Sequence, residues 1–286
     1  FTGTGKTKIV MTATVLAMII NVILDYILIF GKLGFEPMGV KGAALATISG
    51  SFLATLLLFI VYLNKTNQVE FSVLKSFRFN WPIMKKLIVF GSPAGFELFL
   101  NFIAFSVMIS IFHSKGDVAA TATTIMFNWD MVSYIQLLGL EIAVTSLVGR
   151  YMGARKPETA QHAALSAIKI GIFYSLIVLI LFVFIPEALV RVFHPAQPSQ
   201  IFEDAVPIAV NMIKIAALYV LAEAVLVAFV GALRGAGDTF FTMVASVAAH
   251  WSFVPVIYLS LYVFNFSVEL SWFLLVVFFL MFGVVL

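Results

Sequence analysis

Long apolar runs separated by short polar connections dominate the pattern of this chain of 286 residues. A transmembrane helix needs about 20 mostly apolar residues to cross the hydrocarbon core of a bilayer. The strands of a membrane barrel would instead alternate polar and apolar residues, so the pattern predicts helices. We therefore expect an all-α polytopic membrane protein. Eight stretches qualify as spans: 9–31, 40–63, 84–112, 120–149, 159–185, 205–231, 240–263 and 268–286.

The composition supports this interpretation. Hydrophobic residues make up 62% of the chain and charged residues 11%, and the mean hydropathy is +1.09. A soluble domain carries about 25% charged residues, so the supply here cannot cover a water-exposed surface. The chain has no cysteine, which excludes disulfides and thiolate metal sites.

Positive charge gathers in the connections on one side of the predicted spans. Lys and Arg are concentrated before the first span, in 64–83, in 150–158 and around Arg234. Cytoplasmic loops carry such an excess, so loops 64–83 and 150–158 are predicted to be cytoplasmic in a protein of the cell inner membrane. The pI of about 9.1 then reflects orientation in the membrane, and no nucleic-acid partner is expected because the basic residues are dispersed.

The first residues, "FTGTGKT", resemble part of an ATP-binding loop. A similar stretch, "LRGAGDTFFTM", lies at 233–243, with Asp238 at the position of Lys6. A lysine that holds a phosphate would not be replaced by aspartate in an equivalent turn, so we expect a turn between membrane helices and no use of ATP. The matched residues are Gly3, Gly5, Thr7 and Met11 with Gly235, Gly237, Thr239 and Met243.

The same match predicts an internal repeat. Both copies precede an outward-running helix, so the repeat is parallel, with a pseudo-two-fold axis along the membrane normal. We expect residues 1–63 to be the last two helices of an N-lobe, 64–83 a cytoplasmic linker between lobes, and 84–286 a six-helix C-lobe. This predicts a parent of twelve helices, of which the final eight are present, and a chain that does not transport by itself.

Ionisable residues within the spans are costly and mark functional sites. A buried acid can exchange a proton, hold Na⁺ or pair with a cationic solute. Lys169 and Lys214 also fall within spans, as does His250, which we expect to be a packing residue. The acids are Asp25, Glu97, Asp130, Glu141 and Glu223.

Three of these acids are candidates for ion or proton coupling. Glu223 lies four residues after Tyr219, on one helix face, where a carboxylate and a phenol could hold a cation such as Na⁺. Glu97 and Asn101 have the same spacing and follow Pro93, where we expect a broken helix with exposed carbonyls. Asp25 is a candidate for a second proton or ion site. The alternative for each is a structural hydrogen bond between helices.

The remaining acids are candidates for lining a substrate cavity. Asp130 lies among Asn128, Trp129 and Tyr134, a mixture suited to cationic organic molecules. Aromatic packing around one satisfied carboxylate explains the same residues equally well. Glu141 lies about three helical turns beyond Asp130 and extends a polar stripe on that face. Beyond a possible Na⁺ at Glu223, the sequence predicts no metal, no cofactor and no catalytic constellation, so we do not expect an enzyme.

Several motifs resemble the multidrug and toxic compound extrusion (MATE) family across essentially the whole chain. They are "GALRGAGDT", "FTGTGKTK", "NVILDYILIFGKLGFEPMGVKGAALAT" and "SLVGRYMGARKPETA". The resemblance aligns the eight predicted helices with the family's fifth to twelfth. It implies a monomeric secondary antiporter of two six-helix lobes, which exports cationic organic compounds in exchange for H⁺ or Na⁺.

The resemblance also assigns residues. Glu223 matches an acid kept in the tenth helix, with Tyr219 as its aromatic partner, and Asp25 matches a proton site that some members have in the fifth helix. Many bacterial members have an acid in the seventh helix, and this chain has Asn101 at that position. Glu97 lies one turn earlier. Either Glu97 substitutes for the missing acid, or Glu223 acts alone.

Other functions remain open from the sequence. A flippase for lipid-linked oligosaccharides, from the same superfamily, would be expected to line its cavity with Arg and Lys, whereas this chain has five acids and two lysines in its spans. A channel or a non-transporting membrane scaffold would show no dependence of solute flux on an ion gradient. An ATPase would bind nucleotide.

Overall fold

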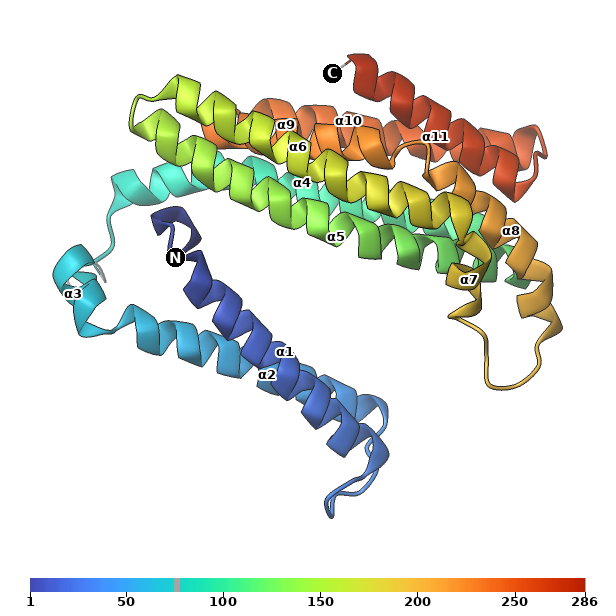
Figure 1. Cartoon of the computed structure of the whole chain (residues 1–286), viewed down its shortest axis with the longest axis horizontal. Helices are drawn as coiled ribbons and strands as arrows, with labels where there is room; N and C mark the ends of the chain where they lie inside the picture. The colour runs from blue at the N-terminus through green and yellow to red at the C-terminus, as the bar shows by residue number, and fades with distance from the viewer. Residues whose placement is uncertain (75–77, 286) are drawn as a thin grey trace. The chain divides into compact units, whose positions relative to one another are not determined.

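A computed structural model describes residues 1–74 and 78–285, and the described residues contain helices and no β-strand. Two compact units divide the chain, Phe1–Met84 and Lys85–Leu286. The helices are labelled in Figure 1. In order they are η1 (Thr2–Thr4), α1 (Thr7–Phe30), α2 (Val40–Tyr62), α3 (Lys65–Phe71), α4 (Trp81–His113), α5 (Asp117–Gly153), α6 (Pro157–Phe184), α7 (Pro186–Arg191), α8 (Gln200–Ala216), α9 (Val220–Ala236), α10 (Thr239–Tyr258), the π-helical turn η3 (Leu259–Val263) and α11 (Val268–Val285).

The helices confirm an all-α, multi-pass membrane protein. Among the described residues, six helices are long and apolar enough to span a bilayer, and α8 with α9 makes a seventh if the bent pair counts as one span. The apolar part of α11, Val268–Met281, is shorter than this test requires. Large apolar side chains such as Phe173 and Phe184 are exposed, as expected of a surface that faces lipid. The predicted number of eight spans is not confirmed.

Two details of the predicted helices are wrong. The stretch 205–231 was expected to be one helix, but the chain bends by 51° between α8 and α9, at residues 217–219. These residues are apolar, so hydropathy gives no sign of the break. Conversely, α4 runs without interruption through Pro93. A proline removes a single backbone hydrogen bond, and the rest of a helix of 33 residues persists around it.

Helices α5 and α9 form the closely packed pair on which unit Lys85–Leu286 is built. A Cβ atom added to Gly231 would lie 2.8 Å from the carbonyl oxygen of Glu141, and one added to Gly235 would lie 2.7 Å from that of Thr145. Glycine therefore lets the two backbones approach. The Thr145 hydroxyl donates to the Gly231 carbonyl at 3.0 Å, which fixes the register of the pair.

In unit Phe1–Met84, α1 and α2 pack as a helical hairpin (Figure 1). The small residues of α2 permit a similarly close approach, since a Cβ on Gly42 would lie 2.7 Å from the Leu28 carbonyl oxygen. Helix α3 lies within 64–83, the segment predicted to link two lobes.

The "FTGTGKT" segment forms the turn that enters α1. Gly5 has a φ of 78° and the matching Gly237 a φ of 100°, in the left-handed region that favours glycine. Asp238 accepts a hydrogen bond from the Phe241 N–H at 3.2 Å and thereby caps α10. Lys6 instead donates to Glu70 at 2.8 Å and to Asn67 at 3.1 Å, so its ammonium group anchors α3.

Candidate functional site

Three polar side chains and an imidazole converge on a small cavity inside unit Lys85–Leu286. Asp130 comes from α5, Tyr219 and Glu223 from the start of α9, and His250 from α10. We call these four residues the Asp130 cluster. The cavity has a volume of about 130 Å³, and apolar and aromatic side chains such as Trp272 complete its wall. Its size suits a small cation better than a drug-sized molecule.

The break between α8 and α9 shapes this cluster. Tyr219 is the N-cap residue of α9, and Glu223 lies in its first turn. The positive end of the helix dipole therefore lies beside the carboxylates of the cavity. The i, i+4 spacing predicts that the Tyr219 phenol and the Glu223 carboxylate hold a cation together. In the structure, the phenol O–H donates to Asp130 Oδ1.

Glu223 has unused acceptor capacity within the cluster. Its Oε2 atom is buried and accepts no hydrogen bond in the structure. Neither Asp130 nor Glu223 forms an ion pair with any described residue. No group of three or more His, Cys, Asp or Glu side chains in the described ranges could hold a metal ion. The cluster thus presents two acids whose charge no side-chain cation balances, which is the condition for taking up a small cation.

Further along the same helix pair, a second polar group binds its own cation. Arg234 of α9 donates from Nη2 to Glu97 Oε1 of α4 at 2.7 Å and from Nη1 to Glu141 Oε1 of α5. We call these three residues the Arg234 cluster. Glu97 is 4% exposed and Glu141 is 6% exposed, so both acids are buried, while the Arg234 side chain is partly buried. The guanidinium group joins three helices.

The role of Arg234 was not predicted. The charge pattern places this arginine in a cytoplasmic connection, whereas α9 continues to Ala236 and Arg234 lies in its last turn. Two signals in the sequence could have indicated its position. Gly231 and Gly235 flank it at helical spacing, and two glutamates at membrane depth require a cation nearby.

Glu97 and Asn101, which the sequence grouped in one site, have different partners. Glu97 pairs with Arg234, while the Asn101 amide donates to Ser246 Oγ on α10 at 2.8 Å. The Asn101 Oδ1 atom is buried and accepts no hydrogen bond. Both side chains connect α4 to neighbouring helices at successive turns.

The residues predicted to line a substrate cavity separate in the structure. Of the five, Asp130 alone lines the small cavity. Asn128 is exposed and its amide donates to the Thr124 carbonyl, and the Trp129 indole donates to the Leu189 carbonyl at 2.9 Å. Tyr134 packs against an apolar group on α5 and α9, and Glu141 belongs to the Arg234 cluster.

Asp25 lies in unit Phe1–Met84. Once the Asn21 amide is oriented to satisfy its neighbours, it donates to Asp25 Oδ2 at 3.2 Å. The Asp25 Oδ1 atom is buried without a hydrogen-bond partner. The i, i+4 pair of Asn21 and Asp25 is therefore present, with one carboxylate oxygen free to accept.

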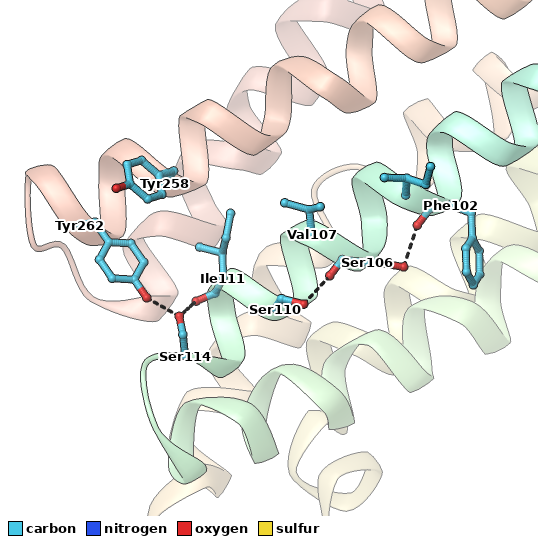
Figure 2. Close-up of a pocket in the computed structure, with 9 residues that line it drawn as sticks. Phe102, Ser106, Val107, Ser110, Ile111, Ser114, Tyr258 and Tyr262 are labelled. Atoms are coloured by element: carbon cyan, nitrogen blue, oxygen red, sulfur yellow. Dashed lines mark hydrogen bonds between the residues drawn. The ribbon is translucent and has the colours of Figure 1, made fainter.

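A larger and more open pocket of about 560 Å³ lies between α4 and the α10–η3 segment. Figure 2 shows Ser106, Ser110 and Ser114 in a row along α4, opposite Tyr258 and Tyr262. Each serine hydroxyl donates to a carbonyl of its own helix, and the lining contains no acid. This pocket therefore lacks the buried acids that the Asp130 cluster presents.

Comparisons with known proteins identify similar chains. The family model described as MatE matches residues 93–259. The chain is 29% identical over 272 residues to a probable multidrug resistance protein NorM of Thermotoga maritima, covering 94% of this chain and 57% of the relative. It is 27% identical over 250 residues to a multidrug resistance protein MdtK of Yersinia pseudotuberculosis, covering 87% of this chain and 53% of the relative.

Solved structures have the same fold. A MOP superfamily transporter from Pyrococcus furiosus, described by the reverse polarity of its binding pocket, superposes with a TM-score of 0.81 at 20% identity. The match covers 96% of this chain and 60% of that chain. The chain thus spans between half and three fifths of the length of the proteins it matches.

Proposed function

The chain belongs to the MatE family, and from this premise we propose that it is part of a secondary antiporter that exports cationic organic compounds in exchange for H⁺ or Na⁺. The relatives named above as multidrug resistance proteins support multidrug efflux. The fold of membrane-spanning helices suits transport across a bilayer. We propose the cell inner membrane as its location, a monomer as its state, and transport without ATP or any other cofactor.

The Asp130 cluster carries this proposal. Two acids, Asp130 and Glu223, lie in a cavity with no ion-pair partner among the described residues. Uptake of H⁺ or Na⁺ there neutralises charge that is costly within a membrane. A bound cation therefore weakens the electrostatic attraction of these two acids for a cationic solute that binds outside the small cavity, and it favours solute release. This electrostatic coupling links the two fluxes, because a ligand shifts an equilibrium by its differential affinity.

Each residue of the cluster has a proposed part. Glu223, whose Oε2 has no hydrogen-bond partner, receives the coupling cation. The negative charge of Asp130 attracts both the coupling cation and the solute. Tyr219 holds Asp130 in place through its O–H. Asp25, in the other unit, is proposed as a second cation site because one of its oxygens is buried without a partner.

A flippase for lipid-linked oligosaccharides is the rival within the same superfamily. A pyrophosphate group would need several arginines or lysines directed into the cavity. The lining of the small cavity contains Asp130 and Glu223 and no Lys or Arg. This distribution of charge favours a cationic solute over a phosphorylated one.

Transport by the full-length protein in proteoliposomes tests the proposal. We expect efflux of a cationic dye to be driven by an imposed H⁺ or Na⁺ gradient, each applied separately, and to be lost in Glu223→Gln. Flux that is independent of both gradients would indicate a channel. Wild-type efflux by Glu223→Gln would contradict the assignment of that residue, and nucleotide-dependent efflux would contradict secondary transport.

A further inference from the structure

The Arg234 cluster contains two carboxylates and one guanidinium group. Glu97 and Glu141 each accept a hydrogen bond from Arg234, so one positive charge is shared between two negative ones. The groups that face this centre are Arg234 from α9 and, from α5, Glu141 and the Tyr134 phenol. Tyr134 lies within electrostatic range of Glu97, Glu141 and Arg234, and also of Glu223 of the Asp130 cluster. With both acids ionised, the cluster would have a net charge of −1 in a buried environment, which is costly.

One oxygen of the cluster shows where the missing positive charge can bind. Glu97 Oε1 is occupied by Arg234, but Glu97 Oε2 is buried and has no hydrogen-bond partner. A buried carboxylate oxygen with no donor loses its hydration without compensation. A proton bound to Oε2 would remove both the orphaned charge and the net charge of the cluster.

A metal cation fits this position poorly. Hard cations take about six or more oxygen ligands, whereas Glu97 Oε2 is the carboxylate oxygen of the Arg234 cluster that is buried without a partner. The Arg234 guanidinium, 2.7 Å from the other oxygen of Glu97, would also repel a metal ion. A proton needs one acceptor only. The chemistry of the cluster therefore suits H⁺ better than a metal cation.

We propose that the Arg234 cluster is a proton-binding site that holds one resident H⁺ on its pair of carboxyl groups, separate from the Asp130 cluster where the coupling cation exchanges. The inference goes beyond the proposed function, since it concerns the equilibrium protonation of the protein and not its transport. Glu97, which the sequence places among the ion-coupling residues, is then a fixed part of the fold. The proton neutralises one carboxylate of the cluster, and Arg234 neutralises the other.

The test is to count protonated carboxyl groups by infrared spectroscopy on the purified full-length protein in lipid nanodiscs. The C=O stretch of a protonated carboxyl group is separate from the carboxylate bands and shifts in D₂O. An Asp130→Asn/Glu223→Gln background removes the other buried acids of the unit. We expect one carboxyl group of this band to vanish in Glu97→Gln, because the proton acceptor is gone.

Two further variants test whether the net charge of the Arg234 cluster decides how many of its carboxyl groups are protonated. Glu141→Gln should also remove the band, because Arg234 then balances Glu97 one to one and no proton is needed. Arg234→Gln should increase the band to two carboxyl groups, because both acids must then be neutral. Glu203→Gln, at an exposed acid, serves as the control and should change nothing. A band that persists in Glu97→Gln, or in Glu141→Gln, would overturn the proposal.

Discussion

The Asp130 cluster and the Arg234 cluster lie on the same pair of helices in the same register. Asp130 and Glu141 are eleven residues apart on α5, and Glu223 and Arg234 are eleven residues apart on α9, which is about three turns in each helix. In the Asp130 cluster, Asp130 of α5 lies near another acid, Glu223 of α9. In the Arg234 cluster, Glu141 of α5 pairs with Arg234 of α9. The arginine in place of an acid on α9 means that the second cluster contains its own cation, whereas the first must bind one.

The surroundings of the two clusters reinforce this difference. The Arg234 cluster lies where Gly231 and Gly235 bring α5 and α9 into backbone contact, and its two acids are buried. The Asp130 cluster lies beside the break between α8 and α9 and opens into a cavity. We infer that close packing fixes the charges in one cluster, while the cavity leaves room for exchange in the other.

The largest effect is expected from removing the internal cation. Arg234→Met removes the cation that pairs with Glu97 and Glu141, and breaking a buried pair by removing one partner costs about 3–5 kcal/mol in the free energy of unfolding. Chemical denaturation of the purified protein measures this loss. Arg191→Met is the control, because Arg191 pairs with Glu187 on the surface and such pairs contribute about 1 kcal/mol or less.

Adding Glu97→Gln and Glu141→Gln to Arg234→Met removes both buried acids together with the arginine. We expect this triple variant to recover most of the lost stability. If it stays as unstable as Arg234→Met alone, the loss would come from packing and not from charge.

The next effect is expected on transport. Glu223→Gln keeps the shape of the side chain but cannot take up a cation, so gradient-driven efflux should fall by about 100-fold, near the upper end of coupling between sites. The unfolding free energy should stay close to that of the wild type, unlike in Arg234→Met. Glu203→Gln, with an exposed acid, is the matched control for loss of a carboxylate. Equal losses in both variants would contradict a specific role for Glu223.

A smaller effect is expected from separating the two helices. Gly235→Ala places a Cβ 2.7 Å from the Thr145 carbonyl oxygen and 2.8 Å from Val148 Cβ, so α5 and α9 must move apart. Overpacking of this kind costs about 1–3 kcal/mol. Gly139→Ala, where no atom lies within 4 Å of the added Cβ, should cost nothing or stabilise the helix slightly. If the denaturation curves of Gly235→Ala and Gly139→Ala coincide, then close packing of α5 and α9 does not decide the stability of the protein at Gly235.

The smallest effect is expected from Tyr219→Phe. The phenol competes with an incoming cation for Asp130, so its removal should lower the cation concentration for half-maximal efflux by about fivefold, which corresponds to the net contribution of about 1 kcal/mol of a typical hydrogen bond. Tyr174→Phe is the control, because its hydroxyl donates to the uncharged oxygens of Ser133 and Gln136. A shift toward higher concentration would show that the phenol assists binding instead.

The sequence predicted the membrane-spanning helices and the family well because both depend on local patterns. Long apolar runs, scarce charges and short motifs such as "GALRGAGDT" are visible without knowledge of contacts. The glycine turn before α1 was also predicted correctly, since a positive φ at Gly5 follows from local chain geometry. The match of the chain to the MatE model confirms the resemblance.

The partners of the polar residues could not be predicted, because they depend on distant segments. Glu97 and Arg234 are far apart in the chain, and the helix that ends beyond Arg234 was expected to end earlier. Tyr219 and Glu223 fit one helix face, yet the break at 217–219 directs the phenol to Asp130 on α5. Spacing along one helix identifies candidate residues, whereas their charge balance is decided between helices.

The most direct test of the contrast between the clusters is cation release on addition of substrate. A cationic dye is added to purified full-length protein in weakly buffered solution, and the H⁺ or Na⁺ released is measured with an electrode. We predict release from the wild type and from Glu97→Gln, and none from Asp130→Asn/Glu223→Gln. Release that persists in the double variant but disappears in Glu97→Gln would contradict the account, because the Arg234 cluster would then be the site of exchange.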